Sequence, residues 1–302
     1  MTREEGIIII GAGPAGTAAA VQLGREGLDP LVLEKGEPGG LVRDANMVEN
    51  YPGFPRGIPG KELAGLIGEH LERFQIRVAR EKVIWLGFRE GRFLVKTPDG
   101  TRTAGIVILA PGTVPAQDHG VEISGEARVR IRFGLNGITT GASTVIIGAG
   151  DAAFDYALNP SSGERVLILG RGKKPRALSL LVDRVKESSR IHYSMNTQVE
   201  GIRAGEDGLV LSLKKAAGSE IPGIFRTAVP DEIRAGFVLF ATGRKPADGF
   251  IARELMEIRG VLEERGRLVP AGDVRGGMCR QVAISAGDGL RAAMMLTRSR
   301  RK

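Results

Sequence analysis

Residues 6–16 read Gly-Ile-Ile-Ile-Ile-Gly-Ala-Gly-Pro-Ala-Gly, and this stretch decides the fold. An apolar run, Gly6–Ile10, is followed at once by the pattern Gly-x-Gly-x-x-Gly and an alanine-rich segment. That order predicts a strand, a tight turn and a helix, as at the start of a dinucleotide-binding βαβ unit. The first glycine allows the turn, the second lets a pyrophosphate approach the backbone, and the third lets the helix pack against the strand.

A related loop lies in the middle of the chain. Gly148–Ala153 reads Gly-Ala-Gly-Asp-Ala-Ala, follows the apolar run Ser143–Ile147, and ends in alanine where the first loop has its third glycine. At both loops, free N–H groups and the positive end of the helix dipole favour a phosphate. A tight strand-to-helix turn without a ligand is the alternative at each position. Two such loops in one chain suggest two bound dinucleotides, and therefore electron transfer between them.

The two loops differ in the charge found at one fixed offset from their first glycines. Glu34 ends the run Pro30–Glu34, where a carboxylate can accept a hydrogen bond from a ribose hydroxyl. In the second unit Arg171 stands at that offset, after the run Arg165–Leu169, with Lys173, Lys174 and Arg176 close behind. Such a cluster attracts a 2′-phosphate that a carboxylate would repel. We therefore expect FAD or an NAD-like adenosine at the first loop and NADPH at the second, the alternative being a basic loop that is only solvated.

The composition is typical of a globular protein with about two domains. Of the 302 residues, 42% are hydrophobic and 26% are charged. No apolar run approaches the ~20 residues that a membrane span needs. A single cysteine, Cys279, excludes an internal disulfide and any cysteine-based metal cluster. The first predicted strand comes within a few residues of Met1, so no signal peptide fits. These features predict a cytoplasmic protein without a metal site.

Much of the net charge of +8 lies in two places. One is the basic segment 171–176, and the other is the tail at residues 298–302, which we expect to be a solvated end. No aromatic residues alternate with the basic ones in the way that single-strand binding favours, so we expect no nucleic-acid partner. A positive surface can still attract an acidic protein.

An internal duplication organises the rest of the chain. The runs Gly105–Gly112 and Gly236–Gly243 are each a predicted buried strand that ends in a turn of small residues. The segment Arg267–Asp273, followed by a helix at about Gln281–Leu296, supplies a carboxylate that could bond the ribityl chain of a flavin. That piece would return to the first unit. The sequence therefore predicts an α/β protein with two nested Rossmann-like domains of three layers (ββα). We place an FAD domain at residues 1–114 and 244–302, and an NAD(P)H domain at 115–243 inserted between them.

Shorter patterns fill the space between these landmarks. Residues 36–60 are irregular and rich in glycine and proline, and an ordered loop of that length is usually functional. The remaining patterns predict helices at about Gly60–Phe74, Ala152–Leu158 and Leu178–Lys186, and a meander of strands at Lys82–Phe88, Arg92–Thr97 and Gly105–Ala110.

Together these motifs resemble the low-molecular-weight thioredoxin reductase family of FAD- and NADPH-dependent pyridine nucleotide-disulfide oxidoreductases. The resemblance covers nearly the whole chain and keeps the order of its motifs. It implies the nested two-domain fold and a homodimer. The motifs that carry it are Gly11–Gly16, Gly39–Gly40, Val48–Gly53, Gly148–Ala153, Arg171–Ala177, Ala241–Pro246, Ala271–Val274 and Arg280–Gly287.

The resemblance also implies a role for each matching position. Backbone N–H groups at the start of the last helix would stabilise negative charge on a reduced flavin. FAD would contact Gly11, Gly13, Pro14, Ala15, Glu34, Lys35, Gly40, Leu41, Val42, Asn50, Ala110, Gly112, Asp273, Arg280, Gln281 and Val282. NADPH, with NADH as the alternative, would contact Gly148, Gly150, Asp151, Ala152, Arg171, Lys173, Arg176 and Gly243.

The chain departs from the family at the redox-active Cys-x-x-Cys. Aligned on Asn136 and Gly137, those positions are Arg132–Leu135, which contain no cysteine. Thiol–disulfide exchange needs an attacking thiolate and a second thiol to resolve the mixed disulfide. Thioredoxin reduction by the family mechanism is therefore excluded. Four smaller departures are Leu41 in the flavin loop, Pro111 in a turn, and Gly170 and Gly172 in the basic cluster.

The leading hypothesis is an FAD-dependent NAD(P)H oxidoreductase that passes electrons to an external acceptor. The acceptor could be a ferredoxin or flavodoxin, a quinone, a small disulfide or oxygen. The alternative is a sensor or structural protein that binds FAD and NADPH with little turnover. Cys279 precedes Arg280 at a predicted helix N-terminus, which could make its thiol reactive, the alternative being a small residue in a turn. His70, His119 and His192 belong to no motif.

Overall fold

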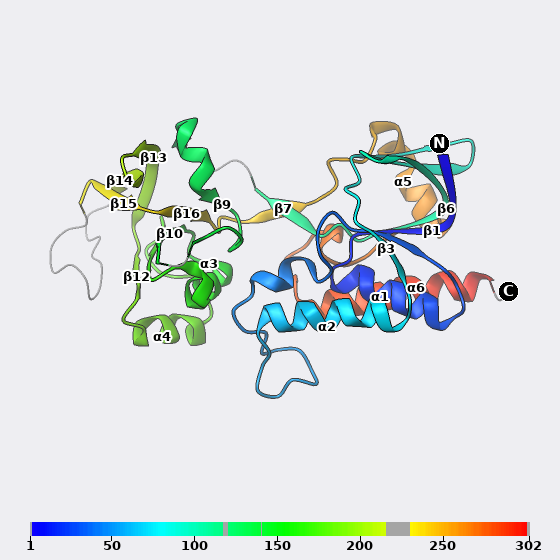
Figure 1. The fold of residues 1–302 in the computed structure, drawn as a ribbon, viewed down its shortest axis with the longest axis horizontal. Helices are drawn as coiled ribbons and strands as arrows, with labels where there is room; N and C mark the ends of the chain where they lie inside the picture. Colours follow the sequence, from blue (N-terminus) through cyan, green and yellow to red (C-terminus); the bar gives the residue numbers. More distant parts are fainter. Residues whose placement is uncertain (1, 117–119, 140, 216–229, 301–302) are drawn as a thin grey trace. The chain divides into compact units, whose positions relative to one another are not determined.

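The computed structural model describes residues 2–116, 120–139, 141–215 and 230–300. The chain divides into two compact units (Figure 1). Two short strands, β7 (Thr113–Pro115) and β17 (Arg244–Pro246), pair where the chain passes from one unit to the other. Unit 1 comprises Met1–Arg43, Val48–Val114 and Arg244–Lys302, and unit 2 comprises Asp44–Met47 and Pro115–Gly243.

Unit 1 is built on a parallel sheet. The first half of its central strand, β6 (Gly100–Leu109), also pairs antiparallel with β5 (Arg92–Thr97), which pairs with β4 (Trp85–Arg89). Strand β6 therefore belongs both to a parallel sheet and to a meander. The parallel strands lie in the order β3 (Arg77–Ala79), β2 (Leu31–Leu33), β1 (Thr2–Ile10), β6 (Gly100–Leu109) and β18 (Leu268–Pro270). The meander adds β5 (Arg92–Thr97) and β4 (Trp85–Arg89). The helices are α1 (Pro14–Arg25), α2 (Gly60–Arg73), α5 (Arg253–Glu264) and α6 (Val282–Arg300).

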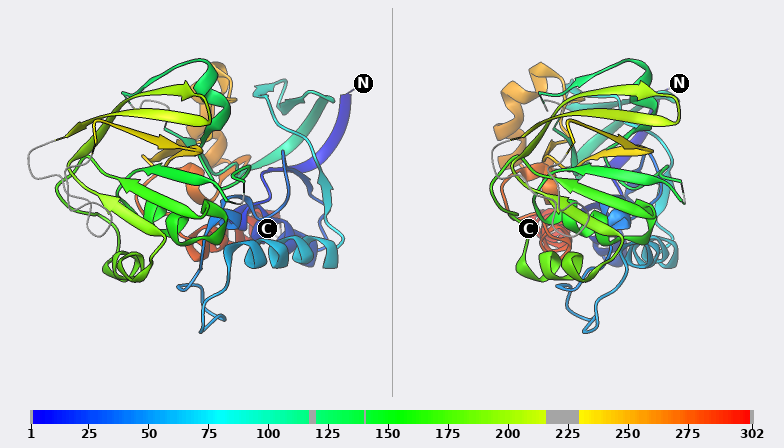
Figure 2. Two further views of the ribbon diagram at one scale, coloured as in Figure 1. Left: turned by 60° about the vertical axis from the view of Figure 1, so that its left-hand side comes forward. Right: turned by 90° about the vertical axis from the view of Figure 1, so that its left-hand side faces the viewer.

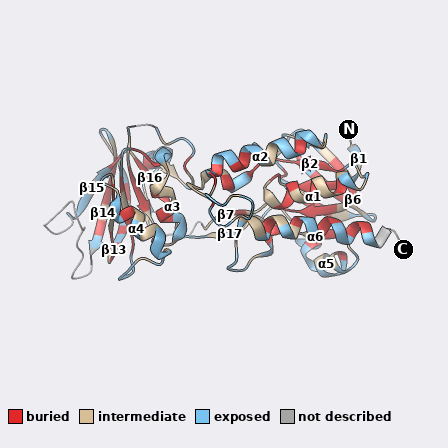
Figure 3. Ribbon diagram, turned by 90° about the horizontal axis from the view of Figure 1, so that it is seen from below, coloured by how far each residue is buried: buried red, intermediate tan, exposed pale blue. Residues whose placement is uncertain are grey.

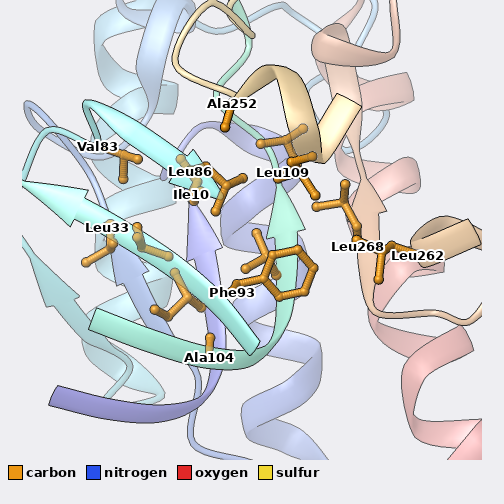
Figure 4. Packing of buried hydrophobic residues seen from close by; sticks show 14 of the residues in the cluster. Ile10, Leu33, Val83, Leu86, Phe93, Ala104, Leu109, Ala252, Leu262 and Leu268 are labelled. Atoms are coloured by element: carbon orange, nitrogen blue, oxygen red, sulfur yellow. The ribbon is translucent and has the colours of Figure 1, made fainter. Parts of the chain in front are cut away.

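Alternate residues of β1 face two separate cores. Ile7 and Ile9 pack with α1 and α6, and α2 lies beside α1 (Figure 1). Ile8 and Ile10 point to the opposite face, where Phe93 of β5 and side chains of α5 complete a second core (Figure 4). A strand covered on both faces has a continuous apolar sequence, which explains the run of four isoleucines. Unit 1 therefore has three layers.

Unit 2 repeats the parallel arrangement. Helices α3 and α4 pack on one face of its sheet around Phe154 and Ile168, and a second sheet covers the other face around Leu211 and Val238 (Figure 2). The parallel strands lie in the order β12 (Ile191–Ser194), β11 (Arg165–Leu169), β10 (Ser143–Ile147), β16 (Phe237–Phe240) and β9 (Ile131–Arg132). The second sheet is ordered β15 (Glu232–Ala235), β14 (Gly208–Lys215), β13 (Thr197–Gly205) and β8 (Glu122–Ile123). The helices are α3 (Asp151–Leu158) and α4 (Ser179–Glu187).

Burial follows these layers. The sheet strands of both units are largely buried, whereas the helices expose one face to solvent (Figure 3). Within the described ranges, no helix is both long enough and apolar enough to cross a membrane. The described residues also form short 3₁₀ helices at η1 (Gly40–Asp44), η2 (Glu126–Arg130), η3 (Pro160–Ser162) and η4 (Gly272–Arg275).

Four predicted boundaries are wrong. The strands expected at Gly6–Ile10 and Gly105–Ala110 begin earlier, at Thr2 and Gly100, because the two strands pair with each other from Thr2 and Thr101 onward. The strand expected at Lys82–Phe88 starts only at Trp85, because Trp85 already pairs with Lys96 and the partner strand ends one residue later. The last helix continues beyond Leu296 to Arg300, because no glycine or proline interrupts the residues that follow. None of these shifts moves a predicted cofactor residue.

Candidate cofactor sites

Predicted FAD-binding residues follow four neighbouring parallel strands of unit 1. Gly11 follows β1, Glu34 follows β2, Ala110 follows β6, and Asp273 comes shortly after β18. The carboxyl ends of parallel strands meet at one edge of a sheet, which is where open α/β sheets bind ligands. The structure therefore gathers these four residues at one edge of the unit 1 sheet.

The first and third glycines of the loop are required by the chain's own packing. Gly11 has a φ of 100°, and its N–H donates to the Leu33 carbonyl over 2.8 Å. A Cβ at Gly11 would lie 2.3 Å from the Ala110 oxygen, and one at Gly16 would lie 1.8 Å from the Gly11 oxygen. Any larger residue at either position must displace backbone.

Gly13 is different, because packing within the chain does not require a glycine there. Its φ of −73° is open to any residue, and a Cβ at this position would meet nothing within 4 Å. Gly13 is the N-cap of α1, and no side chain caps that helix. The first N–H groups of α1 therefore face open space that can take a phosphate. This open position fits the pyrophosphate of FAD.

Glu34 is held beside the loop by two backbone groups. Its Oε2 accepts a hydrogen bond from the Ala12 N–H at 2.8 Å, and its Oε1 accepts one from the Gly36 N–H at 2.9 Å. The side chain is only 8% exposed. Each carboxylate oxygen has a second lone pair, so a ribose hydroxyl can still be bonded. The next predicted residue, Lys35, is exposed.

Distant segments meet at the start of α6. The Asn50 side chain donates from Nδ2 to Oε1 of Gln281 at 3.0 Å, which joins two residues that were predicted to lie along the flavin. The Arg280 guanidinium donates from Nη1 to the Arg244 carbonyl at 2.8 Å. The buried Nε of Arg280 has no hydrogen-bond partner among the described residues. An unpaired buried donor is costly, so this nitrogen suits a ligand acceptor such as a flavin oxygen.

The remaining predicted FAD residues differ in exposure. Asp273 accepts a hydrogen bond from the Ser285 hydroxyl at 2.8 Å. Ala15 is buried and packs so closely on α6 that a Cβ at Gly289 would lie 1.9 Å from its carbonyl oxygen. Gly40 is exposed and begins η1, where Leu41 is 41% exposed and Val42 is buried. Pro14 is the first residue of α1, Gly112 has a φ of 69°, and Val282 begins α6.

The loop of unit 2 repeats the main backbone features of the first loop. Gly148 has a φ of 152°, its N–H donates to Leu169 at 2.9 Å, and a Cβ there would lie 2.5 Å from the Ala241 oxygen. Gly150 has a φ of −99°, and a Cβ would again meet nothing within 4 Å. Ala153 is fully buried, so its single methyl group is accommodated. The second loop therefore offers the same open phosphate position as the first.

Strand register corrects the comparison of Glu34 with Arg171. Ile10 pairs with Leu33 in unit 1, and Ile147 pairs with Leu169 in unit 2. The residue that corresponds to Glu34 is therefore Gly170. The offset was misleading because the path from loop to strand end is one residue shorter in unit 2.

Gly170 leaves no room for a carboxylate in unit 2. A Cβ at this position would lie 2.7 Å from Sδ of Met195 and 2.9 Å from Cβ of Ala149. Met195 is itself buried. Neither residue stood out in the sequence, because their closeness depends on the pairing of β11 with β12.

Backbone hydrogen bonds hold both ends of the basic loop that follows Gly170. The carbonyls of Gly170 and Gly172 accept hydrogen bonds from the N–H groups of Thr197 and Asn196 at 3.0 and 2.9 Å. At the far end the Arg176 N–H donates to the Ala149 carbonyl, inside the glycine loop, at 2.7 Å. The backbone of the basic loop is therefore held beside the glycine loop. The basic loop carries four exposed basic side chains, and none of these forms an ion pair with the described residues. They are Arg171, Lys173, Lys174 and Arg176.

Three further predicted residues complete the surroundings of the second loop. Asp151 is the first residue of α3, and its Oδ1 accepts a hydrogen bond from the Leu178 N–H at 2.8 Å. Ala152 is exposed beside it. Gly243 follows β16 with a φ of 121°, as Gly112 follows β6 in unit 1. These contacts therefore place Asp151, Ala152 and Arg176 beside the second glycine loop.

Comparison with known proteins gives the family. Residues 5–276 match the family model described as pyridine nucleotide-disulphide oxidoreductase. The chain belongs to this family. The thioredoxin reductases of Chlamydia pneumoniae and Treponema pallidum are 30% and 31% identical to it, over 95% and 97% of this chain and 96% of each relative. Members of the pyridine nucleotide-disulphide oxidoreductase family bind FAD and NAD(P)H.

Solved structures share the fold. The thioredoxin reductase of T. acidophilum aligns with a TM-score of 0.79 at 27% identity, over 99% of this chain and 100% of that one. A bacillithiol disulfide reductase from Staphylococcus aureus aligns with a TM-score of 0.71 at 18% identity, over 98% and 99%. The predicted family and the α/β class with two Rossmann-like domains are therefore confirmed.

This family member has no redox-active dithiol. Its one cysteine, Cys279, is exposed in the turn before α6. In the segment Arg132–Leu135, Arg132 lies over the Phe237 ring at 5.0 Å and Leu135 is buried in the core of unit 2. His70 is exposed on α2 and His192 is half-buried on β12, whereas His119 lies outside the described residues. No group of three or more potential metal ligands occurs among the described residues.

Proposed function

We propose that the chain is an FAD-dependent NAD(P)H oxidoreductase that passes electrons from NADPH, through FAD, to an acceptor outside the chain. The observation that carries this proposal is the pair of open glycines, Gly13 and Gly150. Each stands in a loop whose first glycine is fixed by packing, and each lies at the start of a helix that no side chain caps, where a Cβ would meet nothing within 4 Å. Two phosphate positions of this kind support two dinucleotides.

FAD is assigned to unit 1, in residues 1–114 and 244–302. Glu34 is buried beside the loop and suits the ribose, while Asp273 and the residues at the start of α6 suit the ribityl chain and the ring. The unpaired Nε of Arg280 and the linked pair Asn50–Gln281 support a ring bound at that end. When bound, the flavin and nicotinamide supply the redox chemistry, and the chain positions them.

NADPH is assigned to unit 2, in residues 115–243. Gly170 and Met195 leave no room for the carboxylate that would repel a 2′-phosphate. Arg171, Lys173 and Arg176 are exposed on a loop that is fastened to the glycine loop. Guanidinium groups bind phosphate in bidentate fashion, so this arrangement favours NADPH over NADH.

The acceptor must be external, because a dithiol relay is missing. The candidates remain a ferredoxin or flavodoxin, a quinone, a small disulfide or oxygen. We expect the protein to act as a cytoplasmic homodimer, as the family resemblance implies. Cys279 alone cannot both attack and resolve a disulfide, so it is not assigned a catalytic role.

Anaerobic mixing of the FAD-loaded protein with NADPH and with NADH tests this function. We expect NADPH to remove the visible absorbance of the oxidised flavin rapidly, and NADH to do so more slowly at equal concentration. No loss of absorbance with either nucleotide would refute the reductase. It would favour a second candidate, a binding protein with little turnover, which the missing dithiol and the exposed Leu41 in the flavin loop support.

A further inference from the structure

The turn before α6 holds an apolar side chain out in water. Met278 is 99% exposed, and it follows Gly276 and Gly277, whose φ values are 79° and 91°. The Gly276 N–H donates to the Asp273 carbonyl, and the Arg280 N–H donates to the Met278 carbonyl, each at 3.2 Å. The turn is therefore defined by hydrogen bonds and by two left-handed glycines, and it keeps Met278 at its tip.

The surface around Met278 is basic. Strand β17 lies against η4, and these two elements, the turn at residues 276–281 and the first half of α6 together carry five basic residues and two carboxylates. Lys245 is exposed, and the Arg275 side chain is 42% exposed. Both carboxylates are already bonded, since Asp288 pairs with Arg275 and Arg291, and Asp273 accepts from Ser285. The solvent therefore meets an excess of positive charge around one apolar tip.

An exposed methionine ringed by cations has the composition of a protein docking site. Methionine and arginine are enriched at interfaces, and the flexible thioether adapts to different partner surfaces. Positive charge at the rim accelerates the approach of an acidic partner. Arg280 and Gln281, which follow Met278 directly, belong to the proposed flavin end of unit 1, so a protein bound here would lie beside the electron source.

We propose that Met278, Lys245 and Arg275 form the docking surface for an acidic one-electron carrier protein, and that this carrier is the electron acceptor. The inference rests on the proposed function, which it narrows to one class of acceptor. The reaction balances when one NADPH gives NADP⁺ and one proton, and two oxidised carriers each take one electron. The carrier's acidic face would meet Lys245 and Arg275, and Met278 would be buried at the centre of the contact.

Binding and turnover of purified carriers test the proposal. The probes are a plant-type [2Fe–2S] ferredoxin and a flavodoxin, both acidic, titrated calorimetrically into the oxidised, FAD-loaded protein without nucleotide. For Lys245→Glu and for Met278→Asp we expect carrier affinity to fall by about 10-fold or more, as for loss of an interface anchor. NADPH-dependent reduction of ferricyanide, a small acceptor, should be unchanged in both variants, and so should flavin content.

Matched controls place the same kinds of change elsewhere on unit 1. Lys61→Glu and Leu66→Asp, both on α2, alter residues that are also exposed. We expect both control variants to bind the carriers with an affinity within about 2-fold of the wild-type affinity. The remaining difference should shrink as the ionic strength rises, as it does for a change of surface charge. Equal losses in the controls would mean that net charge alone governs binding, and would overturn the assigned surface.

Three other outcomes would also overturn the proposal. The wild type could bind neither carrier, or the variants could bind them as tightly as the wild type does. Met278→Asp could instead change the association state in sedimentation velocity, which would show that a second copy of the chain covers this face. The titration uses no nucleotide, so the binding result can be interpreted even when the proposed reductase activity is absent.

Discussion

The two glycine loops have the same backbone and different surroundings. In each, the first glycine lies under a carbonyl of the neighbouring strand, and the second faces open space. In each, the following carbonyl accepts a hydrogen bond from a distant segment, Gly39 to Ala12 in unit 1 and Arg176 to Ala149 in unit 2. The two units differ at the residue that follows β2 in unit 1 and β11 in unit 2. Unit 1 has the buried Glu34 at this position, and unit 2 has Gly170. The loop therefore indicates that a dinucleotide binds, and the strand end indicates which one.

The units also end their first helices differently. Helix α1 is followed by Gly27, whose φ is 75°, and the Leu28 N–H returns to the Leu23 carbonyl at 3.0 Å. Helix α3 has no such glycine directly after it. Instead the Arg190 guanidinium donates to three carbonyls at the end of α3, those of Ala157, Leu158 and Asn159. One long side chain thus does in unit 2 what a backbone turn does in unit 1.

The largest effect is expected where the loops differ in their third small residue. Gly16→Ala would place a methyl group 1.8 Å from a backbone oxygen, which we expect to cost about 3 kcal/mol of unfolding free energy and to prevent FAD binding. The mirror change, Ala153→Gly, should cost about 1 kcal/mol and leave NADPH binding intact. Urea unfolding and flavin content measure both. A stable, FAD-loaded Gly16→Ala protein would contradict the packing argument.

Arg190→Met should remove the side-chain cap of α3. The carbonyls that Arg190 bonds would lose their partner, and we expect unit 2 to be destabilised by about 2 kcal/mol. Arg165→Met at the exposed start of β11 is the matched control, with an expected change below about 0.5 kcal/mol. Thermal unfolding followed by near-ultraviolet circular dichroism compares them. Equal melting temperatures for the two variants would refute the capping role.

The basic loop should set the preference for NADPH. Removing a charged hydrogen bond to a phosphate costs about 1.4 kcal/mol or more, so Arg171→Ala and Arg176→Ala should each lower the ratio of kcat/KM for NADPH to that for NADH about 10-fold. Arg165→Ala should leave the ratio unchanged. If all three variants keep the wild-type ratio, the loop is only a solvated basic segment and the contrast with Glu34 has no functional meaning.

The smallest effect concerns acid stability of unit 1. A hydrogen bond from the Arg102 guanidinium holds the pKa of the Glu81 carboxyl below its usual range, and Thr97 donates to the same carboxylate at 2.9 Å. The unfolded chain therefore takes up this proton first as the pH falls. The stabilisation is complete above the unfolded pKa of about 4.3 and is lost as the pH drops through the lower native value.

Glu81→Gln tests that contribution. We expect the wild type to be more stable than this variant by about 1 kcal/mol near neutral pH, with the difference shrinking in acid. Urea unfolding at several pH values measures it. In unit 2, the pairs Lys186–Asp183 and Arg203–Glu232 lie at the surface, so neutralising Asp183 should show a smaller difference. A Glu81→Gln curve parallel to the wild type at every pH would contradict the assigned hydrogen bond.

Much of this arrangement could be predicted from the sequence, because its signals are local. A glycine that closes a strand-to-helix turn is visible in sequence, and so is an apolar run ending in Glu34. The family and fold class followed from the order of such motifs and are confirmed, while the residue-by-residue cofactor roles stay predictions. The Gly170–Met195 contact and the Asn50–Gln281 bond could not be foreseen, since they depend on strand register and on segments far apart in the chain.

The most direct test of the account is the absorbance of Gly150→Val mixed anaerobically with NADPH. A Cβ at Gly150 would meet no atom of the chain within 4 Å, so the variant should fold and carry FAD as the wild type does. The added methyl groups would occupy the space assigned to the NADPH pyrophosphate. We predict full flavin content and no loss of the oxidised flavin absorbance when NADPH is added. Loss of that absorbance at the wild-type rate would contradict NADPH binding at the second loop.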